Sequence, residues 1–241
     1  MIDLDKQLKN AVKHFWLTRE SQSQKQGSTS GVRDTGSRSA VTGGKHLDGF
    51  VDICRRILID AGLKDIHIYH QKQLELPGYF RAEKKWDLLA IADNQLIALI
   101  EFKAQVGPSF GNNFNNRTEE ALGNATDLWA AYREGAFKPS ARPWLGYVFI
   151  LEDCLKSRSP VSVKEPHFPT FPEFKDASYL KRYEILLTKL LRERLYDGVG
   201  LILTPEKSGK RGDFSCPDIE LSFQKFAAGL FAHAVAFAQI Q

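Results

Sequence analysis

Cysteine is scarce in this sequence, and its few cysteines form no pattern that indicates a metal site or a disulfide framework. The three residues, Cys54, Cys154 and Cys216, are widely spaced and odd in number. No C-x-x-C pair and no cysteine–histidine cluster occurs, which argues against a zinc module. Nothing resembles the paired cysteines of a small secreted domain. We therefore expect reduced thiols and a cytoplasmic protein.

Long apolar segments and a strong excess of one charge are also lacking. The first residues, MIDLDKQLKN, contain no apolar signal region, and no run approaches the roughly 20 apolar residues of a membrane-spanning helix. The chain has 33 Lys and Arg against 29 Asp and Glu, a formal net charge of +4. We expect a soluble protein whose charge permits an anionic partner but does not require one.

The chain does have the length and apolar content for a substantial core. Of its 241 residues, 43% are hydrophobic, and neither an internal repeat nor a clear linker divides them, so we expect one domain over residues 1–241. Apolar periodicity predicts helices at 3–19, 47–62, 118–134, 179–196 and 223–240, strands at 66–70, 144–151 and 199–204, a hairpin at 85–105, and loops at 106–117 and 156–176. This order predicts an α/β or α+β fold, in which helices flank a mixed β-sheet.

A polar stretch rich in Gly, Ser and Gln runs from residue 20 to residue 46 and contains Arg33, Arg38 and Lys45. Its composition favours a solvated, partly disordered loop, because it has too few apolar side chains to pack. The alternative is an arm that orders on DNA, where amides and hydroxyls contact phosphates and arginines contact guanine edges. The sequence leaves both interpretations open.

The predicted hairpin carries the most informative charges. Asp87 lies early on its first strand, and Glu101 and Lys103 lie late on its second. Alternation predicts that Glu101 and Lys103 share a face with Ile97 and Leu99. Such charges could simply be solvated, but a solvated face would be polar along its whole length. Charges at the mouth of a buried sheet are costly unless they are paired or bind a cation, so they predict a functional site.

Two converging carboxylates suit Mg²⁺, a hard ion that prefers oxygen ligands and keeps several waters. Asp87 and Glu101 are therefore the predicted metal ligands, with the backbone carbonyl of Phe102 as a further one. The ion would lower the pKa of a bound water and neutralise charge on a scissile phosphate. Lys103 would position the attacking water or stabilise the transition state. Asp87, Glu101 and Lys103 are the predicted catalytic residues.

The turn of the hairpin decides whether the two carboxylates can meet. A regular two-residue turn at Asp93-Asn94 would pair position 87 with position 100. Asp87 would then lie on the opposite face from Glu101. The predicted site therefore requires a loop of three or five residues, or a β-bulge.

The order Asp87, then Glu101-x-Lys103, on a hairpin resembles the catalytic motif of the PD-(D/E)xK nuclease superfamily. Trp86 stands where that motif often has proline, and Gln105 extends it to E-x-K-x-Q. Along most of its length the chain also resembles the XhoI-type restriction endonucleases. This likeness is carried by the stretches AVKHFWLTR (11–19), GGKHLDGFVDICRRIL (43–58) and GNNFNNRTEEALGNATDLW (111–129).

The resemblance implies a bacterial, cytoplasmic type II restriction endonuclease with a restriction-endonuclease-like fold. It implies cleavage of double-stranded DNA at the palindrome CTCGAG, after the first C. The enzyme would act as a Mg²⁺-dependent homodimer, because a two-fold protein matches a two-fold site. A cognate DNA methyltransferase would be its genetic partner.

Several polar residues outside the motif are candidates for DNA contacts, although each is a residue type common in turns and on surfaces. Asparagine can form bidentate bonds with adenine and arginine with guanine, while basic side chains neutralise phosphates. The candidates are Asn112, Asn113, Asn115, Asn116, Arg117, Arg33 and Arg38 for bases, Lys207, Lys210 and Arg211 for phosphates, and Lys45 in the polar stretch. Asp48, on the predicted helix at 47–62, and Gln105 are further candidates for the active site.

Two other functions stand beside a restriction endonuclease. One is a repair or junction-resolving nuclease that recognises DNA shape, and the other is a noncatalytic DNA-binding module on the same fold. The presence of Asp87, Glu101 and Lys103 together argues against the module, because a degenerate nuclease is expected to lose at least one of them. Cleavage of DNA of known sequence separates the two nucleases.

Overall fold

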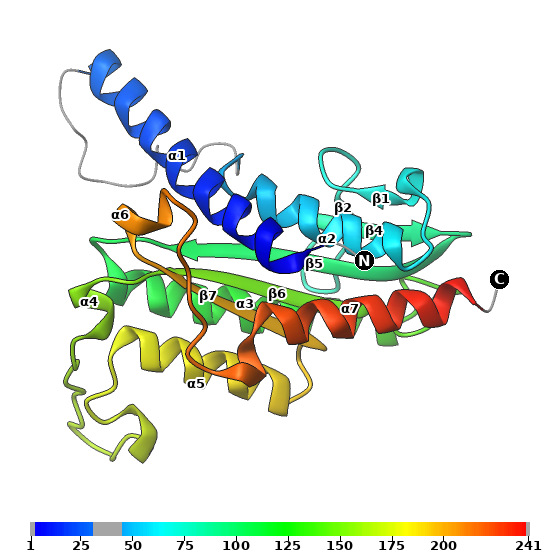
Figure 1. Ribbon diagram of the computed structural model, residues 1–241. Coiled ribbons are helices and arrows are strands. Elements are labelled where there is room, and N and C mark those ends of the chain that lie inside the picture. The colour runs from blue at the N-terminus through cyan, green and yellow to red at the C-terminus, as the bar shows by residue number, and fades with distance from the viewer. Residues whose placement is uncertain (1–2, 31–44, 240–241) are drawn as a thin grey trace.

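The computed structural model describes residues 3–30 and 45–239, in which helices cover both faces of a central β-sheet (Figure 1). The helices are α1 (Leu4–Ser30), α2 (Asp48–Asp60), α3 (Phe110–Arg133), α4 (Leu155–Arg158), α5 (Tyr179–Arg192), α6 (Glu206–Gly209) and α7 (Phe223–Ala238). Short 3-10 helices lie at Lys45–Leu47, Asp65–His67, Pro172–Phe174 and Ile219–Leu221. The strands are β1 (Ile68–Tyr69), β2 (Glu75–Pro77), β3 (Glu83–Lys85), β4 (Leu88–Ala92), β5 (Gln95–Gln105), β6 (Trp144–Glu152) and β7 (Gly198–Thr204). Within these residues, no helix is long and apolar enough to cross a membrane.

The central sheet has the strand order β1-β4-β5-β6-β7. Its first three strands pair antiparallel, whereas β5, β6 and β7 pair parallel. A parallel pair needs a crossover connection, and α3 and α5 lie in the chain between the paired strands. The predicted mixed sheet flanked by helices is therefore confirmed.

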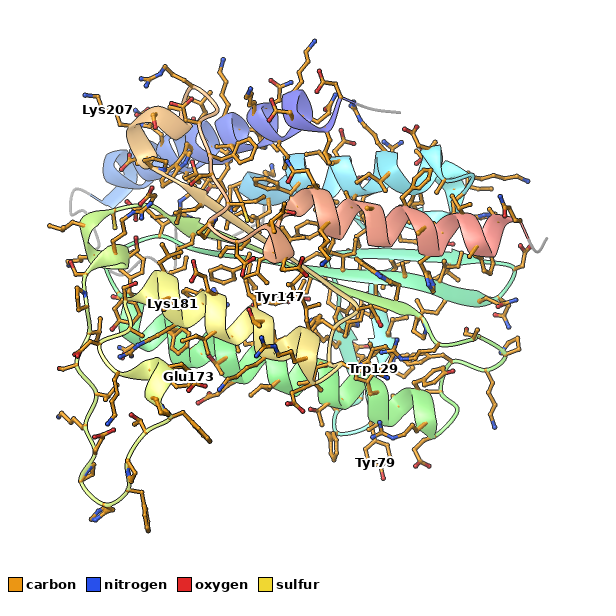
Figure 2. The ribbon with its side chains drawn as sticks, turned by 60° about the horizontal axis from the view of Figure 1, so that its bottom comes forward. Tyr79, Trp129, Tyr147, Glu173, Lys181 and Lys207 are labelled. Carbon is orange, nitrogen blue, oxygen red and sulfur yellow. The ribbon has the colours of Figure 1, made fainter. Side chains whose placement is uncertain are left out.

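Each face of the sheet contributes to its own hydrophobic core. On one face, Phe102 and Val148 pack with residues of α1, α2 and α7. On the other face, Leu99 and Tyr147 pack with residues of α3 and α5. Figures 1 and 2 show these two layers of helices on opposite sides of the sheet. Because both faces are covered, β6 is buried at every position except its last.

The stretch 106–117, predicted as a loop, is helical over most of its length, because α3 begins at Phe110. Asn and Gly have weak helix propensity, which explains the incorrect prediction. Aromatic packing stabilises the early start of the helix. Phe110 stacks on Tyr179 with ring centroids 5.7 Å apart, and Phe114 packs edge-on against Tyr183.

The polar stretch at 20–46, for which composition favours a loop, is also partly helical. Helix α1 continues through it as far as Ser30. Gln and Lys are good helix formers, so a helix already nucleated on its apolar first half can extend through them. Lys45 is exposed at the start of the next 3-10 helix. Arg33 and Arg38 lie outside the described residues.

The strand predicted at 66–70, between α2 and β4, is shorter in the structure. Of these five residues, only Ile68 and Tyr69 pair with β4. The mixed stretch that follows forms a separate two-stranded sheet of β2 and β3. Such a small hairpin is marginally stable alone, so it needs contacts with the rest of the fold.

The buried carboxylate of Asp127, on α3, anchors the tip of this small hairpin. Its Oδ1 accepts hydrogen bonds from the backbone N–H groups of Tyr79 and Phe80, both at 2.8 Å. Its Oδ2 pairs with Nε of Arg81 at 2.8 Å. The hairpin base is held by the Trp86 N–H, which donates to the carbonyl of Leu74 at 2.9 Å. Strand β3 is thus fixed at both ends.

The β4–β5 hairpin combines a two-residue turn with a β-bulge. Asp93 and Asn94 form the turn, with φ angles of 48° and 59°. Ile97 has no partner in β4, and the register shifts at this point. Leu88 therefore pairs with Ile100. The bulge that the predicted site requires is confirmed.

Asp87 is the residue before Leu88, and Glu101 is the residue after Ile100. Because Leu88 pairs with Ile100, Asp87 lies opposite Glu101. The prediction that Ile97 shares a face of the sheet with Leu99 and Glu101 is wrong. Ile97 packs in the core with α1, α2 and α7, whereas Leu96 packs in the core with α3 and α5. The extra residue interrupts the alternation of side chains, so positions before and after it follow different parity.

Substitutions at Asn94 test the turn. Its φ of 59° lies in the left-handed region, which glycine adopts freely and β-branched residues resist. Asn94→Gly is expected to leave the free energy of unfolding unchanged or raise it by about 0.5 kcal/mol, and Asn94→Val to lower it by about 1–2 kcal/mol. Urea denaturation measures both values. Equal effects of the two substitutions would contradict the turn described here.

Candidate active site

The three predicted catalytic residues lie together where β4 and β5 meet. Asp87 directly precedes β4, and Glu101 and Lys103 lie towards the end of β5. Oδ2 of Asp87 accepts a hydrogen bond from the backbone N–H of Phe102 at 2.7 Å. This bond takes the place of a strand partner, because β4 begins only at Leu88. The local structure therefore sets the Asp87 carboxylate against the backbone next to Glu101.

Asp87 is held in a poorly hydrated position near a second negative charge. Burial raises the pKa of its carboxyl, and the Glu101 carboxylate raises it further. The hydrogen bond from Phe102 and the ammonium groups of Lys103 and Lys84 lower the pKa, but the net result is a pKa of about 6. A carboxylate in this environment is stabilised by any added cation.

The Glu101 side chain is almost fully buried and has a lysine on each oxygen. Oε1 accepts from Nζ of Lys103 at 2.5 Å, and Oε2 accepts from Nζ of Lys84 at 2.9 Å. The neighbouring position of β6 is Tyr147, which is fully buried in the interior between the sheet and α5 (Figure 2). Water has little access to Glu101, so the two ammonium groups are its main electrostatic partners.

Lys84 is absent from the predicted site residues. It lies on β3 beside Lys85, which is exposed, and the residue type alone does not distinguish the two. The signal that separates them is the buried Trp86, because residues two apart on a strand share a face. Nζ of Lys84 lies 4.3 Å from the centre of the Trp86 ring.

Lys103 connects the site to α3. Its Nζ lies 3.8 Å from Oε2 of Glu120, which in turn accepts from Nη1 of Arg117 at 2.6 Å. Burial lowers the pKa of Lys103, but attraction to Glu101, Asp87 and Glu120 outweighs it, and the net pKa is raised. Lys103 is therefore an ammonium ion at neutral pH. The Arg117 guanidinium, predicted as a base contact, is engaged by Glu120 in this structure.

The two further active-site candidates lie apart from each other. Gln105 is buried at the end of β5, and its Nε2 donates to the carbonyl of Val106 at 3.0 Å. Asp48 opens α2 and lines a separate polar cavity of about 340 Å³ with His14 and His70. Burial raises the pKa of Asp48, and His14, Lys45 and His70 lower it. No side-chain hydrogen bond or ion pair among the described residues joins either one to Glu101.

The remaining candidates for DNA contacts lie at two places. Asn112, Asn113, Asn115 and Asn116 are on the first turns of α3, and all but Asn113 are exposed. Lys207 is exposed on α6 at the periphery of the molecule (Figure 2), and Lys210 and Arg211 follow it. Lys210 pairs with Glu20 and Glu206. Helix α6 directly follows β7, so these basic residues lie at the end of the sheet towards which the parallel strands run.

The donor groups at the site fit a hard cation that keeps part of its water shell. The described residues contain no cluster of three or more His, Cys, Asp and Glu side chains arranged for a metal. The site instead offers the carboxylates of Asp87 and Glu101. The amide and carbonyl of a strand residue point to the same side, so the Phe102 carbonyl is expected on the Asp87 side. Two carboxylates and a carbonyl are a ligand set suited to Mg²⁺ with several waters.

Residues 25–216 match the family model described as restriction endonuclease XhoI. The chain belongs to the XhoI family of restriction endonucleases. The matched residues include the whole β4–β5 hairpin, with Asp87, Glu101 and Lys103. No solved structure shows significant similarity to the chain.

Similar proteins of the XhoI family are named type II restriction enzymes. BstVI of Geobacillus stearothermophilus is 47% identical over 213 residues, which cover 86% of this chain and 95% of that protein. XhoI of Xanthomonas vasicola is 44% identical over 193 residues, which cover 79% and 77%. AbrI of Azospirillum brasilense is 49% identical over 170 residues, which cover 70% and 75%. The likeness therefore extends over most of each protein.

The raised pKa of Asp87 predicts a pH dependence of stability. The folded chain holds this proton more tightly than the unfolded chain, because the pKa rises from an ordinary 3.8 to about 6. The resulting stabilisation is present at low pH and is lost as the pH rises from about 4 to above 6, roughly 3 kcal/mol in full. Asp87→Asn removes this loss. Without divalent cations, its free energy of unfolding should exceed the wild-type value by a margin that grows across this pH window.

Urea denaturation in EDTA at several pH values measures the margin. Asp60→Asn, at an exposed aspartate on α2, is the matched control for the change from Asp to Asn. A difference between Asp87→Asn and wild type that stays constant from pH 4 to pH 7 would contradict the assigned pKa.

Proposed function

We propose that this type II restriction endonuclease of the XhoI family cleaves double-stranded DNA at CTCGAG, after the first C, with Mg²⁺. The observation that carries the proposal is the pair Asp87 and Glu101, brought to one place by the bulged hairpin, with Lys103 bound to Glu101. The family match and the names of the relatives support sequence-specific cleavage of DNA. The resemblance to the XhoI-type enzymes supports this particular palindrome.

In the proposed mechanism, Asp87, Glu101 and the Phe102 carbonyl would hold Mg²⁺. When bound, this ion supplies a water of lowered pKa and neutralises negative charge on the scissile phosphate. Lys103 keeps its proton, since the surrounding carboxylates raise its pKa despite burial. Its ammonium group can therefore donate to the attacking water or to a phosphate oxygen as negative charge develops. Glu101 orients that ammonium group through their hydrogen bond.

The proposed enzyme acts as a homodimer, because a palindrome presents the same bases to two protomers related by a two-fold axis. Base contacts are assigned to the asparagines on the first turns of α3 and to Arg33 and Arg38, and phosphate contacts to Lys45, Lys207, Lys210 and Arg211. A base contact by Arg117 requires that its ion pair with Glu120 break when DNA binds. A methyltransferase that protects the same site is the proposed genetic partner.

Digestion of a linear DNA that contains one CTCGAG site tests the proposal. The wild type should give two fragments with 5′-TCGA ends in Mg²⁺ and none in EDTA. Glu101→Ala and Lys103→Ala should each lower the cleavage rate by about a hundredfold or more, because each removes a group that acts on the transition state. Glu119→Ala and Lys85→Ala change exposed residues of the same types and should cut like wild type.

Each failure in this experiment has a different meaning. Cleavage of another sequence would overturn CTCGAG but not the nuclease. Cleavage of only branched or damaged DNA would favour a shape-recognising nuclease, and binding without cleavage would favour a noncatalytic module. Full activity in Glu101→Ala and Lys103→Ala would overturn the assigned site.

The oligomeric state is a separate prediction. Sedimentation equilibrium should give about twice the chain mass of 27.2 kDa for the protein alone, and that mass plus the mass of one duplex for the complex with CTCGAG DNA. One duplex should bind per two chains. A single chain that cuts both strands of one site would contradict the homodimer.

A further inference from the structure

We propose that Lys84 couples metal loading of the cleavage site to DNA binding. In the free protein, its ammonium group occupies Oε2 of Glu101 and there competes with a divalent cation. A DNA phosphate offers this ammonium a second partner, so bound DNA frees Glu101 for the cation. The inference rests on the proposed function, because it takes Asp87 and Glu101 as cation ligands.

Lys84 is held at the site by several contacts at once. Its side chain is 11% exposed, and its Nζ lies 2.9 Å from Oε2 of Glu101. The same Nζ donates to the carbonyl of Lys85 at 3.0 Å and lies over the ring of Trp86. Lysine is almost never buried without a partner, so its position against Glu101 is a specific feature of the site.

The small β2–β3 hairpin places Lys84 there independently of Glu101. Lys84 pairs with Leu76 across the two strands. Asp127 holds the tip of the hairpin through Tyr79 and Phe80, and Trp86 holds its base. Because both ends are anchored, the backbone of Lys84 stays in place when its ammonium group changes partner.

The charges of the site balance without a metal. The connected side chains carry three negative and three positive charges, namely Asp87, Glu101 and Glu120 against Lys84, Lys103 and Arg117. A divalent cation adds two positive charges to this partly buried cluster, where uncompensated charge is costly. The negative charge of a phosphodiester compensates part of that excess. Cation and DNA should therefore bind more tightly together than separately.

Of the two lysines on Glu101, Lys84 is the one that can leave at lower cost. Lys103 is two residues from Glu101 on the same strand and is also attracted by Glu120. Lys84 reaches Glu101 from a separate sheet, and its Nζ has two further partners outside Glu101, the Lys85 carbonyl and the Trp86 ring. Its contact with Glu101 is thus the one that a cation replaces.

Calorimetric titration with Ca²⁺ as the probe cation, with and without a CTCGAG duplex, tests the coupling, and gel analysis checks that the duplex stays intact. In wild type, the duplex should raise the Ca²⁺ affinity by about tenfold or more. Lys84→Met should raise the Ca²⁺ affinity of the free protein by about tenfold, because a competing positive charge is removed. The further gain from DNA should then fall to about threefold or less.

Lys85→Met is the matched control, since it removes the neighbouring charge that does not touch Glu101, and it should behave like wild type. Lys84→Arg keeps a cation at this position and should retain most of the DNA-induced gain. A merely structural role for Lys84 would lower stability without raising the Ca²⁺ affinity, so urea denaturation is measured in parallel. If the Met variant does not fold, Lys84→Gln allows the same comparison.

Unchanged Ca²⁺ affinity and an unchanged DNA-induced gain in a folded Lys84 variant would overturn the inference, even if the wild type cuts CTCGAG. Failure of the wild type to cut any DNA would overturn the proposed function instead, and the digestion experiment reports that result separately. The two failures are therefore distinguishable.

Discussion

The electrostatic repulsion between Asp87 and Glu101 is the constraint on which the rest of the site depends. Both carboxylates lie where little water reaches them, and the Glu101 charge makes ionisation of Asp87 more costly. The protein offsets this cost with Lys84 and Lys103 on the two oxygens of Glu101. Positive charge close to Asp87 lowers the cost of ionising its carboxyl, although the connected side chains as a whole already balance their charges. The same arrangement lowers the stability of the metal-free protein at neutral pH, which is a common cost of functional sites.

Three separate parts of the fold supply this cluster. The central sheet contributes Glu101 and Lys103 on β5, the anchored small hairpin contributes Lys84, and α3 contributes Glu120. Helix α3 also carries Asp127, which holds the tip of the small hairpin. The helix that carries the candidate base contacts is therefore connected by side chains to the residues proposed to bind the metal.

The sequence allows the catalytic residues to be predicted, because Asp87, Glu101 and Lys103 interrupt strands that are otherwise apolar. It also shows that a bulge or an odd-length loop is needed, but not where it lies. Ile97 has the same chemistry as its neighbours, and only pairing with β4 identifies it as the extra residue. The role of Lys84 is hard to predict from the sequence for a similar reason. Its neighbour Lys85 is the same residue type, and the fold of the small hairpin determines which of the two side chains is buried.

The order of helices and strands follows from apolar periodicity, and the mixed sheet follows from that order. The ends of helices and strands are harder to predict from the sequence where tertiary contacts override local conformational preference. Helix α3 begins at Phe110 because aromatic side chains pack there, although Asn and Gly dominate the stretch. Helix α1 extends to Ser30 through polar residues that indicate a loop by composition. In both cases the local sequence has only a weak helical preference, and packing or an adjoining helix determines where the helix begins or ends.

The bulge at Ile97 limits how the hairpin can change length. Loss or gain of one residue between Asn94 and Glu101 would exchange the two faces of β5 beyond that point. Glu101 would then enter the apolar core beneath α1 and α2, and Phe102 would take its place among the charges. A change of two residues would leave both where they are. Insertions and deletions of an even number of residues are therefore the ones that keep Glu101 on its face of the sheet, and the number of residues from the turn to Glu101 is part of the geometry of the active site.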